Sequence, residues 1–303
     1  MDVPAIDVPA LDQPAELGDF LRTRRARLRP EDVGLVSYGG RRRVPGLRRE
    51  ELAQLAGVSV AYYTRLEQGQ SHQASEGVLD ALARALRLSP DEQAYLRELA
   101  RPARARRRPA VRHDKARSGV RRLLAAMADV PAVAVGPRFE VLAWNRLGHA
   151  LIAGHLDVDS PGRPLDRPNT QRMLFLDPHT RELYPDREAE LRRAVCALRV
   201  AAGQRPDDPQ LTALIGELSM KSTEFSALWS RHGVSNCTFG SKRFHHPLVG
   251  EMVLDFEMMR TPDGSGQGVL MYTAEEGSPS EAALRLLAAE RGPDVRVLEP
   301  ERP

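Results

Sequence analysis

The sequence predicts a chain of two domains, an all-helical N-terminal domain followed by a domain of the α+β class. Helical periodicity with clear start and stop signals fills the N-terminal third. The remainder carries apolar, strand-like runs that alternate with helical patterns. Between them, the segment 102–119 is rich in Arg and Pro, which is typical of a linker. We therefore expect domains at 16–101 and 120–292, a disordered leader at 1–15 and a tail at 293–303.

The composition indicates a globular protein rather than a membrane or secreted protein. Of the 303 residues, 42% are hydrophobic and 28% are charged, and no stretch approaches the roughly 20 apolar residues that span a bilayer. The acidic, Pro-rich N-terminus does not have the pattern of a signal peptide. Because Cys196 and Cys237 match no metal-binding spacing, we expect a cytoplasmic protein with reduced cysteines, no metal site and no cofactor.

The net charge of +3 is divided unevenly along the chain. Residues 1–118 contain 22 Lys and Arg against 16 Asp and Glu, whereas residues 119–303 contain 22 against 25. A positive charge confined to one part of a chain is expected where that part binds a polyanion such as nucleic acid. A solvated, arginine-rich surface explains the same numbers equally well, so the charge alone does not decide.

Five helices are predicted in the N-terminal domain. The first begins at Glu16 and ends before Pro30. The others are predicted at 48–56, 59–68, 75–87 and 90–101. Ser59, Ser75 and Ser89 stand where the last three helices begin, and serine is a preferred N-cap. Proline follows Ser89 at the first helical position, and a Glu stands three residues after the cap.

A helix-turn-helix is predicted in the run RREELAQLAGVSVAYYTRLEQG. Two short helices that cross steeply need a small residue at their contact, which Ala53 provides. Gly57, four residues later, suits a turn with a left-handed backbone. Val58, Tyr63 and Leu66 follow at +5, +10 and +13 and are expected to hold the second helix on the core. The alternative for this pattern is an αα-hairpin in a helical bundle.

The second helix of this motif is the expected DNA-reading helix. Recognition helices enter the major groove by their N-terminal residues, which here are Ser59, Val60, Ala61 and Tyr62. Arg65, one turn later, can donate to guanine, with a phosphate contact as the alternative. Arg49, at the start of the preceding helix, is expected to contact a phosphate. The DNA backbone or the minor groove is the expected contact of Arg41, Arg42 and Arg43. A packing role for Tyr62 and a solvated loop for the three consecutive arginines stay open.

Three runs of the N-terminal third carry a family resemblance: LGDFLRTRRARL, GRRRVPGLRREELAQLAGVSVAYYTRLEQG and VLDALARALRLSPDEQAYLRELA. They are similar to the XRE-type helix-turn-helix domain of actinobacterial regulators. The resemblance implies a five-helix, lambda-repressor-like fold that binds double-stranded DNA. The run QSHQASEGVL departs from the family, which usually has a short, basic, Pro-containing turn there, so phosphate contacts from this loop are in doubt.

Strands and helices occur in blocks in the C-terminal domain. The predicted strands are 131–135, 138–144, 248–259 and 268–273. The predicted helices are 145–155, 186–202, 209–219, 222–231 and 279–291. Two strands, a helical middle, further strands and a last helix are typical of an α+β domain with helices on one face of its sheet.

Several separated motifs of this domain carry a second resemblance: FEVLAWNRLGHAL, NTQRMLFLDPHTRELYPD, LRVAAGQRPDDPQLTALIGELSMKSTEFSALWSRHGV, KRFHHPLVGEMVLDFEMM and YTAEEGSPSEAAL. They resemble the ligand-binding domain of MmyB-like transcription regulators from about 120 to 290. The resemblance implies a PAS-like fold that binds a small apolar molecule, of which a fatty acid is the best-known type. The family's Trp after an Asp is replaced here by Arg187, which follows Asp186, so a pocket wall made by that Trp is lost or rebuilt.

Residues of both polar and apolar types are candidates for such a ligand pocket. Apolar walls with a few polar groups suit an acyl chain with a carboxylate head. The candidate wall residues are Trp144, Phe175, Phe225, Trp229 and Leu254, and the candidate polar residues are Asn145, Asn169, Arg172, Arg231 and His246. Aromatic residues at such spacings are more often core residues, so both interpretations stay open.

No catalytic motif is present, and we expect no enzyme. The sequence contains no H-E-x-x-H, G-x-S-x-G, P-loop or G-x-G-x-x-G pattern. His245 and His246 are adjacent, so in a strand they point to opposite faces and do not easily bind one metal ion.

The sequence thus favours a one-component transcription regulator. Its first domain binds an operator, and ligand binding to the second changes the population of the DNA-competent homodimer. A dimer is expected because one recognition helix covers too few base pairs for useful specificity. Two alternatives stay open: a C-terminal dimerisation or docking module without ligand, and, with weaker support, an enzyme tethered to DNA.

Overall fold

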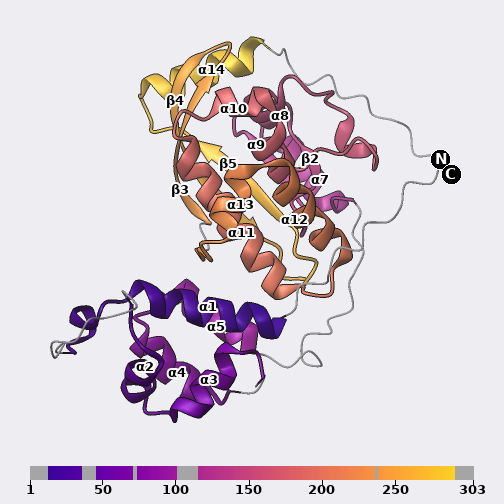
Figure 1. Ribbon diagram of the computed structural model, residues 1–303. Coiled ribbons are helices and arrows are strands. Elements are labelled where there is room, and N and C mark those ends of the chain that lie inside the picture. The colour runs from indigo at the N-terminus through magenta and orange to yellow at the C-terminus, as the bar shows by residue number, and fades with distance from the viewer. Residues whose placement is uncertain (1–12, 36–45, 71–73, 101–114, 236–237, 291–303) are drawn as a thin grey trace. The chain divides into compact units, whose positions relative to one another are not determined.

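The computed structural model describes residues 13–35, 46–70, 74–100, 115–235 and 238–290 (Figure 1). Contacts divide the chain into two compact units, of which unit 1 comprises Met1–Pro109 with Leu191–Asn236, and unit 2 comprises Ala110–Glu190 with Cys237–Pro303. Most of the predicted leader and linker and all of the predicted tail lie outside the described residues, as do Arg41, Arg42 and Arg43. In the described part of the chain, no helix is long and apolar enough to cross a membrane.

The N-terminal part of unit 1 is helical, with bounds that differ from the predicted ones by at most three residues. Its elements are α1 (Gln13–Arg27), the 3-10 turn η1 (Pro30–Val33), α2 (Arg49–Ala56), α3 (Val60–Glu67), α4 (Glu76–Ala85) and α5 (Pro90–Ala100). The predicted serine caps form: Ser59 accepts from Tyr62 N at 3.2 Å, and Ser75 accepts from Val78 N at 3.4 Å. These caps satisfy backbone N–H groups that the helix itself leaves without a partner.

The core of this part is built from the apolar faces of α1 to α5. Phe20, Leu52, Leu82 and Leu96 are among its fully buried members. A close approach of α1 to α3 depends on Gly18, because a Cβ at this position would overlap the backbone carbonyl of Glu67. The contact of these two helices is therefore set by a residue without a side chain.

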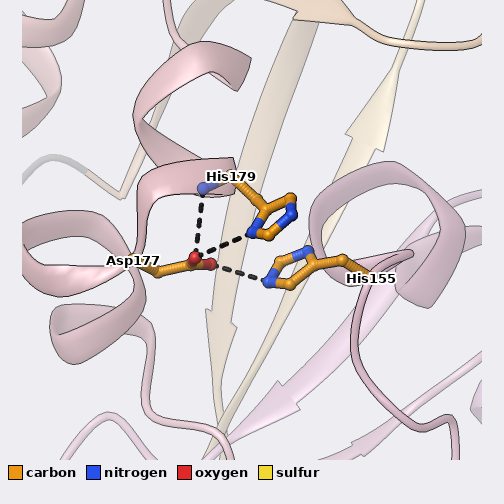
Figure 2. A group of neighbouring side chains, drawn as sticks. All are labelled: His155, Asp177 and His179. Atoms are coloured by element: carbon orange, nitrogen blue, oxygen red, sulfur yellow. Dashed lines mark hydrogen bonds and ion pairs between the residues drawn. The ribbon is translucent and has the colours of Figure 1, made fainter.

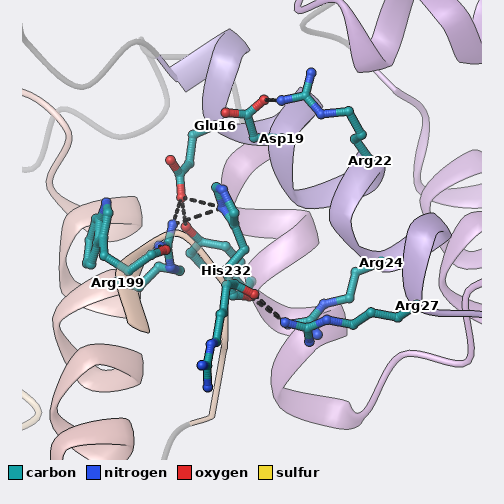
Figure 3. Close-up of polar contacts among 10 residues, drawn as sticks. Glu16, Asp19, Arg22, Arg24, Arg27, Arg199 and His232 are labelled. Atoms are coloured by element: carbon teal, nitrogen blue, oxygen red, sulfur yellow. Dashed lines mark hydrogen bonds and ion pairs between the residues drawn. The ribbon is translucent and has the colours of Figure 1, made fainter. Parts of the chain in front are cut away.

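Unit 1 also contains most of α11 (Arg187–Gln204) and all of α12 (Pro209–Lys221) and α13 (Thr223–Trp229). Figure 3 shows the polar contacts through which α1 meets this part of the chain. Arg199 of α11 is completely buried, pairs with Glu16 of α1 and lies over the ring of Trp229, with 4.0 Å between Cζ and the ring centroid. Arg24 donates from Nη2 to the carbonyl of His232 at 2.8 Å.

Unit 2 is an antiparallel, five-stranded sheet with helices around it (Figure 1). Its strands are β1 (Ala132–Val135), β2 (Val141–Trp144), β3 (Phe239–His246), β4 (Gly250–Arg260) and β5 (Gly268–Thr273), in the spatial order β2-β1-β5-β4-β3. Its other elements are α7 (Ser118–Ala126), α8 (Arg146–Ala153), the 3-10 turn η2 (Ser160–Gly162), α9 (Thr170–Leu176), α10 (Pro178–Leu183) and α14 (Pro279–Glu290). The two-part architecture predicted from the sequence is confirmed at this level.

The prediction missed one strand and three helices of unit 2. The strand is β3, an edge strand whose exposed and buried positions alternate in the polar run FGSKRFHH. A search for apolar runs passes over such a strand, because its outward positions are polar. The helices are α7, α9 and α10, of which the last two span only 7 and 6 residues. Helical periodicity is detected over stretches of about 11 to 18 residues, so helices as short as α9 and α10 are easily missed.

Helices pack on both faces of the sheet, so the prediction of helices on one face is wrong. The register places Ala132 and Ala134 on one face, where they pack against Leu124 of α7. Phe244 and its neighbours lie on the opposite face, where the ring of Tyr184, just after α10, is 5.2 Å from that of Phe244. All of β1 is buried, and a strand that is buried on both sides is a continuous apolar run rather than an alternating one.

Candidate nucleic-acid interface and ligand cleft

The turn between α2 and α3 has the geometry that the spacing predicts. Gly57 adopts a φ of 64°, in the left-handed region, where a residue without Cβ has no steric penalty. The amide of the next residue, Val58, donates to the carbonyl of Ala53 at 3.0 Å. Ala53 is fully buried, and Tyr63 and Leu66 hold α3 in the core. The two helices are therefore joined by a tight, well-capped turn.

The N-terminal half of α3 presents one exposed surface. Ser59, Val60, Ala61 and Arg65 are exposed and form what we call the α3 surface. The Arg65 side chain forms no ion pair or hydrogen bond with the described residues and is available to a partner. Tyr62 is half-buried and packs against the core, in line with the alternative that the sequence left open for it.

A buried carboxylate holds α3 in place. Glu67, with a side chain only 1% exposed, accepts from Arg25 Nε at 2.7 Å and from Arg49 Nε at 2.7 Å. The hydroxyl of Tyr63 donates to it at 2.7 Å. Burial raises the pKa of Glu67, but the bonds from Arg25, Tyr63 and Arg49 outweigh it and lower that pKa. The ionised carboxylate thus joins α1, α2 and α3.

Sequence reasoning missed Glu67 and its bond to Arg49. The Nε of Arg49 is bonded to Glu67 while its side chain is 42% exposed, and the phosphate contact of Arg49 stays a prediction. A signal for the buried acid is present in the sequence, because Glu67 follows Tyr63 and Leu66 at the helical spacing of core residues. The partner arginines come from other helices, so the spacing alone does not identify them.

A cleft of about 660 Å³ lies in unit 2, between α7 with the turn after it, the start of α8, and α14. Its apolar lining residues are Leu124, Met127, Leu147, Leu284 and Leu287 together with alanines of α7 and α14. The charged lining residues are two cations, Arg146 and Arg285, and two anions, Asp129 and Glu281, and Arg285 pairs with Glu281 at 2.7 Å. The volume lies within the range of small-molecule sites, about 300–1,000 Å³. Apolar walls with a few charged groups suit a small amphipathic ligand.

Two of the predicted polar ligand residues are helix caps. Asn145 lines the cleft, but its Oδ1 accepts from Ala132 N and Gly148 N, and its Nδ2 donates to Met127 O and Val130 O. Asn169 caps α9 by accepting from Gln171 N and Arg172 N, and donates to Arg138 O. Each amide is thus used by the backbone around it, and both residues position elements.

The remaining predicted ligand residues are divided between the two units. Trp144, Arg172, Phe175, His246 and Leu254 belong to unit 2, and Phe225, Trp229 and Arg231 belong to unit 1. None of these eight lines the cleft. Within unit 2, Phe175 and Leu254 are buried, Arg172 is exposed, Trp144 donates to Val158 O at 2.7 Å, and His246 Nε2 lies 3.0 Å from Ala150 O. Arg187, at the position of the family's Trp, donates to Leu174 O at 3.0 Å.

Comparison with known proteins finds a matching family for each of the two regions of the chain. The profile of the MmyB-like transcription regulator ligand binding domain matches residues 116–287, more than half of the 303 residues. The profile of a helix-turn-helix domain matches residues 16–96. No curated protein matches the chain. These matches confirm the resemblances seen in the sequence: the chain belongs to the DNA-binding transcription regulators that join a helix-turn-helix domain to an MmyB-like ligand-binding domain.

Proposed function

We propose that this regulator is a one-component sensor, which reads a specific operator through the α3 surface and binds a small amphipathic acid in its ligand-binding domain. The observation that supports operator binding is that the N-terminal residues of α3 are exposed while the helix itself is held in place by the buried Glu67. A reading helix must be rigid, because base contacts depend on the placement of a few side chains. Operator binding is proposed to occur as a homodimer.

Arg65→Ala is expected to reduce affinity by about 1–3 kcal/mol and to relax specificity at one base pair. The reason is that a single arginine on the reading helix contacts one guanine edge. Binding is measured on DNA that the wild-type protein enriches from a random pool, and on each single-base variant of that DNA. Arg84→Ala, an exposed arginine of α4, is the matched control and should leave the base preference unchanged. Equal losses on all sequences would show that Arg65 contacts phosphate instead.

The cleft of unit 2 supports the sensing half of the proposal. It combines apolar walls with the guanidinium groups of Arg146 and Arg285, which lie beside the carboxylates of Asp129 and Glu281. Apolar walls with a few polar groups suit an acyl chain with a carboxylate head. A fatty acid is therefore the ligand class that we propose. The antiparallel order β2-β1-β5-β4-β3 supports the PAS-like assignment that the family resemblance implies.

Filling the cleft should weaken ligand binding. Ala288 lines the cleft on α14, so Ala288→Trp is expected to lower the affinity for fatty acids at least about tenfold by occupying their volume. Titration calorimetry with a series of medium- and long-chain fatty acids measures the effect. Ala282→Trp, an exposed position of α14 outside the cleft lining, is the control. Unchanged binding in Ala288→Trp would place the ligand elsewhere.

A second candidate function follows from the exposed β3–β4 part of the sheet face on which α7 packs at β1. Phe239, Val253 and Met259 are 70%, 51% and 61% exposed, and the register of β3 and β4 puts them on the same face. Exposed apolar residues gathered on one face favour a dimerisation or docking module. Absence of acyl-ligand binding to the purified protein would support this second function.

A further inference from the structure

Two histidines and one aspartate meet outside the cleft and the α3 surface (Figure 2). His155 follows the end of α8, Asp177 stands between α9 and α10, and His179 lies in the first turn of α10. One ligand atom from each residue lies within 4.8 Å of the other two. His155 Nε2 is 2.7 Å and His179 Nδ1 is 3.4 Å from the carboxylate of Asp177.

The carboxylate of Asp177 is held in place by two hydrogen bonds. It accepts from His179 N at 3.1 Å and from Thr180 Oγ1 at 2.8 Å. A fixed anion between two imidazoles is a ready set of two nitrogen ligands and one oxygen ligand.

We propose that His155, Asp177 and His179 bind one divalent transition-metal ion of the Zn²⁺, Co²⁺ or Ni²⁺ type. Imidazole nitrogen with carboxylate oxygen is a donor set that suits these ions, whereas Ca²⁺ and Mg²⁺ select oxygen ligands. The segments that supply the ligands are separate, so the ion would join the end of α8 to the junction of α9 and α10.

One side chain must turn for the ion to bind. The two imidazole rings are stacked, with centroids 4.4 Å apart and planes 10° apart, so the lone pairs of their nitrogens lie in two nearly parallel planes and cannot both point at one ion between the rings. His179 is 69% exposed and can rotate, whereas His155, at 22%, is more enclosed. Water or a second molecule completes the coordination on the exposed side. A three-ligand, partly open site binds an exchangeable ion rather than a permanent structural one.

The test uses the untagged, full-length protein after treatment with a chelator. Co²⁺ is titrated and followed by its d–d absorption, and bound Zn²⁺ is counted by equilibrium dialysis and elemental analysis. The wild-type protein is expected to bind one ion per chain through this site. His155→Ala and Asp177→Asn should each weaken binding at least about tenfold. Asn can still accept from His179 N, so the second variant keeps the cap of α10. His245→Ala, which removes an exposed histidine of β3, should bind as the wild type does.

Several results would overturn the proposal. The first is that the wild-type protein takes up no Co²⁺ at millimolar concentration. The second is unchanged metal binding in His155→Ala and Asp177→Asn. The third is a thiolate charge-transfer band, which would assign the ion to a cysteine. His179→Gln guards against a folding artefact, because this exposed residue contributes little to the core. Its circular dichroism should match that of the wild type while its metal affinity falls. Unchanged affinity in this variant would likewise contradict the proposal.

Discussion

Glu67→Ala is expected to destabilise unit 1 by about 3–5 kcal/mol, because breaking a buried ion pair leaves its partners without compensation. The change removes the acceptor of Arg25, of Arg49 and of the Tyr63 hydroxyl at once. Two arginines would then lie close together without the anion that balances them, and α3 would lose its polar link to α1 and α2. Operator binding should be lost as well, since the α3 surface belongs to the same helix.

Urea unfolding gives the change in stability, and hydrogen exchange of peptides from 46–70 localises it to α2 and α3. Because the chain has two units, exchange is the more direct measurement of the two. Glu50→Ala, an exposed glutamate of α2, is the control and should change stability by less than about 0.5 kcal/mol. Glu67→Gln keeps the volume but not the charge, and should fall between the two. A loss below about 1 kcal/mol in Glu67→Ala would show that the arginines find other partners.

Acid should weaken unit 1 through Glu16. Burial raises the pKa of this carboxyl, but a hydrogen bond with His232 and the charges of Arg199 and His232 lower it from 4.5 to about 2. The hydroxyl of Tyr95 adds a further bond at 3.1 Å. A carboxyl whose pKa is lower in the folded state stabilises the fold fully above its unfolded pKa. That stabilisation is lost as the pH falls through the folded value.

The expected loss from Glu16 is about 3 kcal/mol between pH 5 and pH 2, because a tenfold difference in proton affinity between the folded and unfolded states corresponds to about 1.4 kcal/mol. Chemical unfolding of the wild type and of Glu16→Gln at several pH values measures it. The variant should be less stable at neutral pH and should lose less on acidification. Glu31→Gln, at an exposed glutamate of η1, should follow the wild type. Parallel pH curves for Glu16→Gln and the wild type would show that Glu16 is not a source of acid sensitivity.

The buried Arg199 is one of the groups that lower the pKa of Glu16, after the hydrogen bond with His232. Arg199 is fully buried in unit 1 and pairs with Glu16 (Figure 3). It also donates to the carbonyl of Trp229 and stacks on the ring of that residue. Guanidinium suits such a site, because its planar fork pairs with a carboxylate while its face packs on an aromatic ring. Protonation of Glu16 would leave this cation without its counter-charge.

The features that the sequence predicts well are those that neighbouring residues decide. The caps at Ser59 and Ser75 and the left-handed turn at Gly57 each depend on a few adjacent positions. The same is true of the apolar faces of α1 to α5, which repeat within single helices. The helix-turn-helix and the class of its function were therefore accessible without coordinates.

Features that depend on contacts between distant segments of the chain could not be predicted from the sequence. Glu67 looks like an ordinary glutamate until Arg25 and Arg49 arrive from two other helices. The sequence makes Asn145 a candidate ligand residue, yet four backbone groups occupy its amide. The cleft at α14 likewise joins segments more than a hundred residues apart in the sequence.

By itself, the sequence determined the helix-turn-helix, the two-part organisation and the regulator family, because local spacing and recurring motifs carry that information. Only the tertiary structure decided which charges are buried, which faces of the sheet are covered, where the cleft lies, and that His155 meets Asp177 and His179. The physical reason is that burial and ion pairing depend on which distant segments pack together, whereas helix periodicity, capping and turn conformation depend on residues within a few positions of one another.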